Sequence, residues 1–188
     1  MTAIETVSMN CECGARHESG HMVIAAVEGL RLRPEGLMVD PSGWGLACYH
    51  DAPEDSDPAR ERNILAVLAG FAVEKRYREA HSYPPRDYLD VTWNDDNRKA
   101  RRLLGRLGGI YGANDRRLRE QLNGLVEKYW RVIDALASAL LRKNWETLKP
   151  LPSGGQWSAP SETRVKYLPG DEVVLILAEH RIEAVLGD

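Results

Sequence analysis

The segment ARHESGHMVIAAV, residues 15–27, predicts a buried helix that begins near Cys13, ends near Val27 and has two histidines on one face. The residues after His21 are almost all apolar, which is typical of a helix that lies in the core rather than on the surface. Positions four residues apart share one face of a helix and lie about 6 Å apart along its axis. The side chains of His17 and His21 can therefore converge on one metal ion.

Glu18 completes the motif H-E-x-x-H, which predicts zinc-dependent hydrolysis. Zinc binds histidine nitrogen at about 2.0–2.1 Å, and a catalytic site keeps one position for a water molecule, whose pKa falls to near 7. A carboxylate beside the metal can take the proton of that water and pass it to a leaving amine. We therefore expect His17 and His21 to bind Zn²⁺ and Glu18 to act as general base. The alternative is a solvent-facing helix without metal, but a buried His–Glu–His cluster without a metal would be costly.

A zinc site needs a third protein ligand, and the residues that follow the motif do not supply one. The metzincin pattern requires glycine three residues after the second histidine and histidine six residues after it. Those positions hold Ile24 and Val27, so the chain does not fit that class. The other candidates are three histidines and one glutamate, namely His50, His81, His180 and Glu74.

Composition and charge exclude several classes of protein. The chain has 188 residues and a net charge of −3, so it fits one domain and gives no electrostatic reason to expect nucleic acid or an anionic membrane as partner. We expect the basic run at 98–106 to be a solvated face and the acidic run at 51–57 to be a solvated loop. No apolar stretch approaches the roughly 20 residues that span a bilayer, and the N-terminus does not resemble a signal peptide.

Three cysteines, Cys11, Cys13 and Cys48, do not make an even disulfide framework, which favours free thiols in a reducing cytoplasm. The sequence contains no G-x-x-x-x-G-K-[ST] phosphate loop, so we expect no ATPase activity of its own. We therefore predict a cytoplasmic protein that depends on a partner for any ATP-driven step.

Turn signals and apolar periodicity predict the remaining elements. Pro34-Glu35-Gly36 and Pro41-Ser42-Gly43 read as turns that bracket short strands. The predicted strands are 37–39 and 44–50, and the predicted helices are 58–80, 94–108 and 114–148, with a loop at 81–94 and a linker at 149–162. For the last segment both helix and strand remain open, although Asp171 and Glu172 favour a helix start.

These elements predict an α+β fold that is mostly α-helical, with a small β-sheet next to the zinc helix and a C-terminal helical bundle. We expect a single domain over residues 1–188, with the zinc site in 1–112 and a helical C-terminal part in 113–188. The long helix at 114–148 is expected to form core and possible homo-oligomer contacts.

The strand after the zinc helix suggests how a peptide substrate would bind. An extended peptide can add to the exposed edge of a strand through backbone hydrogen bonds, and glycines allow a close backbone approach. We expect the substrate to lie along Gly43, Trp44, Gly45, Leu46 and Ala47. The alternative is a strand that is paired on both sides.

Several segments, in the same order, resemble the zinc peptidase domain of the FtsH-type membrane AAA+ proteases. ARHESGHMVIAAV is similar to that family's Y-H-E-A-G-H-A helix, and VDPSGWGLACYHDAPE resembles the strand that follows it. ILAVLAGFAVEKRY is similar to I-x-V-x-L-G-G-R-A-A-E-E, and DDNRKARRLL to N-D-L-x-x-A-T-x-L-A. VIDALASALL and LPGDEV continue the pattern, so the resemblance covers most of residues 13–177.

The resemblance implies that the third zinc ligand is the aspartate of the N-D-L motif. Asp96 takes this place because Ala100 then falls four residues later, as in the family. Aligning on Asn94-Asp95 instead makes Asp95 the alternative ligand. A further alternative is that the aspartate only caps a helix N-terminus.

The sequence also departs from the family. Phe71 stands where the family has arginine, Asn97 stands where it has leucine, and neither the membrane anchor nor the AAA+ module is present. The resemblance therefore implies a zinc metalloendopeptidase for peptides or unfolded polypeptides, unless a separate ATPase or adaptor partner delivers other substrates. The alternative is a non-catalytic, zinc-stabilised binding or adaptor protein that keeps the peptidase fold.

Overall fold

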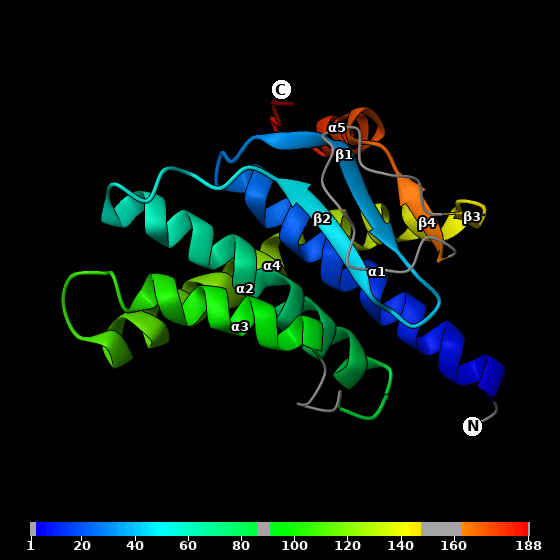
Figure 1. Cartoon of the computed structure of the whole chain (residues 1–188), viewed down its shortest axis with the longest axis horizontal. Helices are drawn as coiled ribbons and strands as arrows, with labels where there is room; N and C mark the ends of the chain where they lie inside the picture. Colours follow the sequence, from blue (N-terminus) through cyan, green and yellow to red (C-terminus); the bar gives the residue numbers. More distant parts are fainter. Residues whose placement is uncertain (1–2, 86–90, 148–162, 188) are drawn as a thin grey trace.

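The computed structural model describes residues 3–85, 91–147 and 163–187. The fold is α+β and mostly helical, with a small antiparallel sheet, as predicted (Figure 1). The elements run in the order α1 (Ala3–Val27), β1 (Leu32–Val39), β2 (Gly45–Tyr49), α2 (Asp57–Ala80), α3 (Val91–Leu104), α4 (Tyr111–Arg142), β3 (Glu146–Thr147), β4 (Arg164–Leu168) and α5 (Gly170–Glu179).

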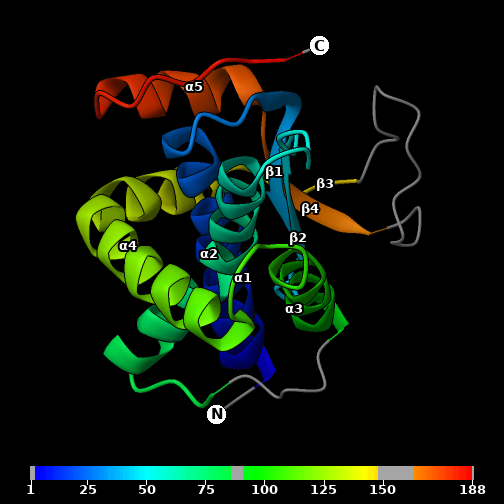
Figure 2. The same ribbon diagram turned by 90° about the vertical axis from the view of Figure 1, so that its left-hand side faces the viewer.

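Helix α1 is the centre of the molecule. It contacts β1 and β2 on one side and α2 and α4 on the other, as Figure 2 shows. In its second half Met22, Val23 and Ile24 are each 0% exposed, so the apolar run after His21 lies in the core, as predicted. The helix begins at Ala3, ten residues before the predicted start at Cys13.

The sheet has the strand order β2-β1-β4-β3. Strand β1 is longer than predicted because Pro34-Glu35-Gly36 forms an irregularity within the strand rather than a turn. Gly36 has φ +63°, and a Cβ there would lie 2.0 Å from the carbonyl oxygen of Leu168. Only glycine fits this position, so a signal that we interpreted as a turn marks a bulge.

The second predicted turn does connect two strands. The amide of Asp40 donates to the carbonyl of Trp44 at 2.8 Å, and Gly43 has φ +86°. The Asp40 carboxylate accepts from the amide of Ser42 at 2.8 Å, which holds the turn. Strand β2 pairs with β1 alone among the described strands, so the alternative of pairing on both sides is wrong for this part of the chain.

The C-terminal part is not purely helical, which corrects the predicted helical bundle. Strand β4 joins the sheet beside β1, with Val39 opposite Lys166. Both faces of this strand are covered: Val165 packs with Tyr167 in a small cluster, whereas Leu168 on the other face packs in the main core. The last segment forms helix α5, as Asp171 and Glu172 predicted. The predicted linker at 149–162 lies outside the described residues.

Helix α3 was predicted at 94–108 after a loop at 81–94. It begins three residues earlier, at Val91, and ends four residues earlier, at Leu104. Residues 86–90 of that predicted loop are outside the described part of the chain. We expected the acidic run at 51–57 and the basic run at 98–106 to be solvated; Arg102 and Arg106 of the basic run are exposed and pair with the acidic run. Glu54 accepts from Arg102 at 2.7 and 2.9 Å and from Arg106 at 2.5 Å.

Across the described helices, none is long and apolar enough to cross a membrane.

Candidate metal centre

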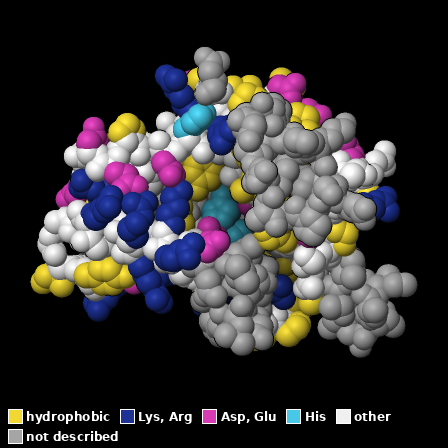
Figure 3. Space-filling model, viewed as in Figure 1, with side chains coloured by type: hydrophobic (Ala, Val, Ile, Leu, Met, Phe, Trp, Pro, Cys, Tyr) yellow, Lys and Arg dark blue, Asp and Glu magenta, His cyan; other side chains and the backbone are white. Residues whose placement is uncertain are grey.

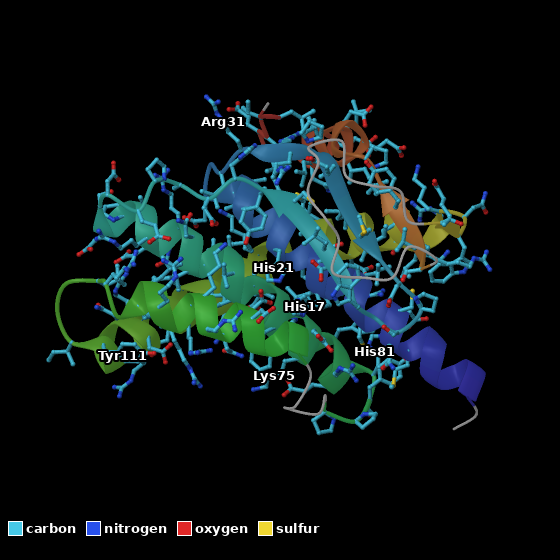
Figure 4. All side chains as sticks on the ribbon, viewed as in Figure 1. His17, His21, Arg31, Lys75, His81 and Tyr111 are labelled. Atoms are coloured by element: carbon cyan, nitrogen blue, oxygen red, sulfur yellow. The ribbon has the colours of Figure 1, made fainter. Side chains whose placement is uncertain are left out.

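His17, His21 and Asp96 come together between α1 and α3. Nε2 of His17 lies 3.1 Å from Oδ2 of Asp96, and Nε2 of His21 lies 3.2 Å from the same oxygen. Figure 4 places both histidines in the centre of the molecule, where α1 passes behind β2. Within the described residues, these three form the one group of histidine, cysteine and acidic side chains that could hold a metal ion.

The spacing of these atoms fits one metal ion. Ligand atoms about 2.0–2.1 Å from a tetrahedral ion lie about 3.3 Å from one another. The two nitrogen-to-oxygen separations of 3.1 and 3.2 Å are close to this value. All three ligand atoms lie within 4.8 Å of one another, so the group could hold one ion.

The far nitrogen of each histidine is held by the protein, which directs Nε2 toward the metal position. Nδ1 of His21 lies 2.7 Å from the carbonyl oxygen of Ala66, which can only accept, so Nδ1 carries the proton. Nδ1 of His17 lies 3.0 Å from Glu74 Oε2, and the other Glu74 oxygen accepts from Arg78 at 2.8 Å. Such outer contacts orient metal ligands and raise their basicity.

Glu74 is therefore not a metal ligand in this geometry, although the sequence left that possibility open. It contacts the opposite side of the His17 ring. The other candidate histidines are also outside the group that could hold a metal. His81, for example, stacks on Tyr77 with ring centroids 4.0 Å apart.

Asp96 and Asp95 have separate environments. The Asp95 carboxylate accepts from Arg98 at 2.8 Å and is 60% exposed, whereas the Asp96 side chain is 27% exposed and faces the histidines. Because α3 begins at Val91, Asp96 lies inside the helix, which rules out the alternative that it caps the helix N-terminus. The geometry thus brings Asp96, rather than Asp95, to the two histidines.

Gly70 of α2 forms the wall behind the two ligand nitrogens. A Cβ at this position would lie 2.4 Å from Nε2 of His21 and 2.5 Å from Nε2 of His17. Any side chain would enter the space that an ion between the histidines needs. The absence of a side chain at Gly70 is therefore a condition for metal binding here.

Charge holds the three side chains together when no metal is present. Burial alone would lower the pKa of His17, but hydrogen bonds to Asp96 and Glu74 outweigh burial and raise that pKa to about 10. Burial would likewise lower the pKa of His21, and the nearby Asp96 raises it. The same contacts outweigh the effect of burial on Asp96 and lower the pKa of its carboxyl. A metal would therefore have to displace protons from the histidines.

Glu18 lies beside the three potential ligands in a pocket of about 310 Å³. A Cβ at Gly45 would lie 2.5 Å from Cγ and 2.9 Å from Oε1 of Glu18, so the backbone of β2 passes directly over this carboxylate. Figure 3 shows histidine side chains at the floor of a hollow on this face, with basic side chains along one margin. The pocket thus opens on this face and has the Glu18 carboxylate beside the three potential ligands.

Four of the five residues predicted to bind a peptide line this pocket, namely Trp44, Gly45, Leu46 and Ala47. Gly43 does not, because it lies in the turn against α1. A Cβ at Gly43 would lie 2.4 Å from the carbonyl oxygen of Asn10. Gly43 therefore serves the packing of the hairpin on α1.

Sequence reasoning missed Gly70 as the wall of the site and Glu74 as the support of His17. A signal for both was present, because Ala66, Gly70 and Glu74 are four residues apart and share one face of α2. It also missed Tyr49 and Lys99, which line the pocket. For Tyr49 the signal was the alternation of β2, which places it on the same face as Gly45.

Comparison with known proteins gave no match: no protein-family model matches this chain, and no curated protein matches it. A functional assignment therefore depends on the chemistry of the site itself.

Proposed function

We propose that this protein is a zinc-dependent metallopeptidase that hydrolyses peptide bonds in peptides or unfolded polypeptides. The observation that carries the proposal is the meeting of His17, His21 and Asp96 in one pocket with Glu18. In this proposal the first three bind Zn²⁺ and Glu18 is the general base. The similarity of the sequence to the FtsH-type peptidase domain supports the same assignment.

The donor set favours zinc over other common ions. Two neutral imidazole nitrogens and one carboxylate oxygen are usual catalytic zinc ligands, and three protein ligands leave a position for water. Zinc supplies the site with a water molecule whose pKa is near 7. Calcium and magnesium prefer sets made of oxygen ligands, whereas two of the three donors grouped here are imidazole nitrogens.

Glu18 moves the proton in the proposed reaction. It accepts a proton from the attacking water as the new carbon–oxygen bond forms and the carbonyl electron pair moves onto the oxygen. It then gives that proton to the leaving nitrogen as the carbon–nitrogen bond breaks. Glu18 lies against the Gly45 backbone of the strand that borders the pocket, which supports this role.

The substrate in this proposal is an extended chain that lies along β2. Strand β2 is at the edge of the described sheet and lines the pocket with Trp44, Gly45, Leu46 and Ala47. Backbone hydrogen bonds at a strand edge select an extended conformation rather than a folded surface. We place the protein in the cytoplasm, where three free, buried cysteines stay reduced, and where a separate ATPase could deliver unfolded substrates.

The test is the variant Glu18→Gln, compared with wild type and with Asp95→Asn as matched control. We expect Glu18→Gln to keep one zinc per chain by mass spectrometry and to lose about 10²–10⁴-fold in cleavage of casein or a fluorogenic peptide. Asp95→Asn should retain both zinc and activity. Wild-type cleavage by Glu18→Gln would remove the mechanism. Tight zinc binding without cleavage under any condition would favour the non-catalytic adaptor.

A further inference from the structure

The pocket contains few side chains that could donate a hydrogen bond to a substrate, apart from the histidines. They are Trp44, Tyr49 and Lys99. The ammonium group of Lys99 is engaged by both oxygens of Asp51, at 2.8 Å each. Trp44 packs with Met38 on the other face of the sheet. Tyr49 is the remaining donor.

Alternation along β2 places Tyr49 on the face of the strand that borders the metal position. Residues two apart in a strand share one face, and Gly45, on this face, lies against Glu18. Ala47 and Tyr49 pack on the main core, which includes α1, whereas Leu46 packs with the group on the opposite face. The side chain of Tyr49 is thus directed into the space between β2 and the helices that carry the potential ligands.

Helix α3 closes this space from the other side. The ammonium nitrogen of Lys99 lies 5.8 Å from the centre of the Tyr49 ring. Lys99 follows Asp96 by three residues, so both project from the same face of α3. Tyr49 therefore lies beneath the stretch of α3 that delivers the third potential ligand.

The hydroxyl of Tyr49 is available as a donor. It makes no hydrogen bond to any residue that the structure describes, and it is not among the fully enclosed polar atoms that lack a partner. Burial, together with the nearby carboxylates of Asp51, Asp96 and Glu18, raises its pKa well above the ordinary value of 10. The phenol therefore stays protonated while the peptidase works.

We propose that Tyr49 donates a hydrogen bond to the carbonyl oxygen of the scissile peptide bond as that oxygen gains negative charge. This inference rests on the proposed peptidase function. When water adds to the carbonyl carbon, the electron pair of the double bond moves to the oxygen, and it returns when the carbon–nitrogen bond breaks. A fixed donor that faces this oxygen stabilises the charge when it is largest and has little effect on the neutral substrate. Tyr49 transfers no proton in either step.

The test is Tyr49→Phe in the zinc-loaded protein, with Tyr167→Phe on the opposite face of the sheet as matched control. Removing one such donor lowers kcat by about 10²-fold in known hydrolases. We expect a loss of that order in kcat for Tyr49→Phe, with KM and zinc content unchanged, and no change for Tyr167→Phe. A phosphinic peptide, which mimics the charged tetrahedral centre, should bind Tyr49→Phe about 10²-fold more weakly, whereas the product peptide should bind equally well.

The outcomes separate this inference from the proposed function. If wild type cleaves peptide and Tyr49→Phe matches it in kcat and in phosphinic-peptide affinity, the role of Tyr49 is wrong and the peptidase stands. If wild type does not cleave but binds the phosphinic peptide in a Tyr49-dependent way, the hydrogen bond stands and the peptidase proposal fails. If wild type neither cleaves nor binds the phosphinic peptide, both are overturned.

Discussion

The two sides of the candidate metal centre are built in different ways. On the α1–α2 side, the helices are in close contact, since a Cβ at Gly20 would lie 2.8 Å from Cγ2 of Val73. The supports of the histidines are also enclosed there: Glu74 and Arg78 are only 2% and 6% exposed. This half of the site is therefore a rigid part of the core.

Helix α3, which carries Asp96, has a weaker attachment. Its inner face is apolar, with Leu103 and Leu104 buried, but its outer face and the residues just after its end are held by exposed ion pairs. Arg102 and Arg106, at 44% and 55% exposed, both bind Glu54 of the acidic loop. Exposed ion pairs contribute about 0–1 kcal/mol each and are screened by salt. The difference suggests that the histidines are preorganised, whereas the position of Asp96 is more easily adjusted.

On the rigid side, the largest loss of zinc binding is expected for Gly70→Ala. The new methyl group would occupy the space between the two Nε2 atoms, so we expect the variant to purify without zinc while its circular dichroism stays that of wild type. Gly124→Ala is the matched control, because a Cβ on this helical glycine meets no atom within 4 Å. It should bind zinc fully and gain about 0.5–1 kcal/mol in the free energy of unfolding. One zinc per chain in Gly70→Ala would mean that the metal lies elsewhere.

A smaller loss is expected for Glu74→Gln, which removes the charge that supports His17. Loss of such an outer contact lowers metal affinity by about 10–100-fold. Competition with a chelator of known zinc affinity would measure the change. The control is Glu79→Gln on the same helix, whose only ion pair among the described residues is a loose one of 3.9 Å with Lys75. Since the contact is buried, the loss should be the same in low and high salt, and a loss that disappears in salt would contradict a buried support.

The smallest effect is expected on the α3 side, for Glu54→Gln. Weakening its pairs with two arginines should lower zinc affinity by about fivefold in low salt, which corresponds to about 1 kcal/mol. At about 1 M salt, where the Debye length is near 3 Å, the variant should match wild type. Glu61→Gln, which breaks the pair with Arg117 of α4, is the control. An effect as large as that of Glu74→Gln would show that the two sides are equally rigid.

Local patterns predicted most of the fold, and the failures have physical causes. The apolar run after His21 was enough to identify a core helix, because an all-round apolar helix has no other stable place. The first ten residues of that helix have no such pattern and were missed. Asn10 in this stretch packs against the hairpin turn, since a Cβ at Gly43 would lie 2.4 Å from its carbonyl oxygen. The bulge at Gly36 was read as a turn, because a positive φ has the same sequence signal in both.

The site was predictable only as far as it is local. His17, Glu18 and His21 lie within five residues, so helical spacing alone places them together. Asp96 comes from another helix, and the residues by themselves left the third ligand open until the family resemblance selected it. Gly70 shares no motif with the histidines, since its role depends on which face of α2 meets α1, and this is decided by the packing of the whole core.

The pairing of β1 with β4 has a consequence for the order of folding. Val39 lies opposite Lys166, so the hairpin of β1 and β2 keeps an open edge until a strand from the far end of the chain arrives. Contacts between such distant residues slow folding, and an uncovered strand edge can pair with another chain in the meantime. A newly made chain would therefore assemble its helical core early and complete its sheet last.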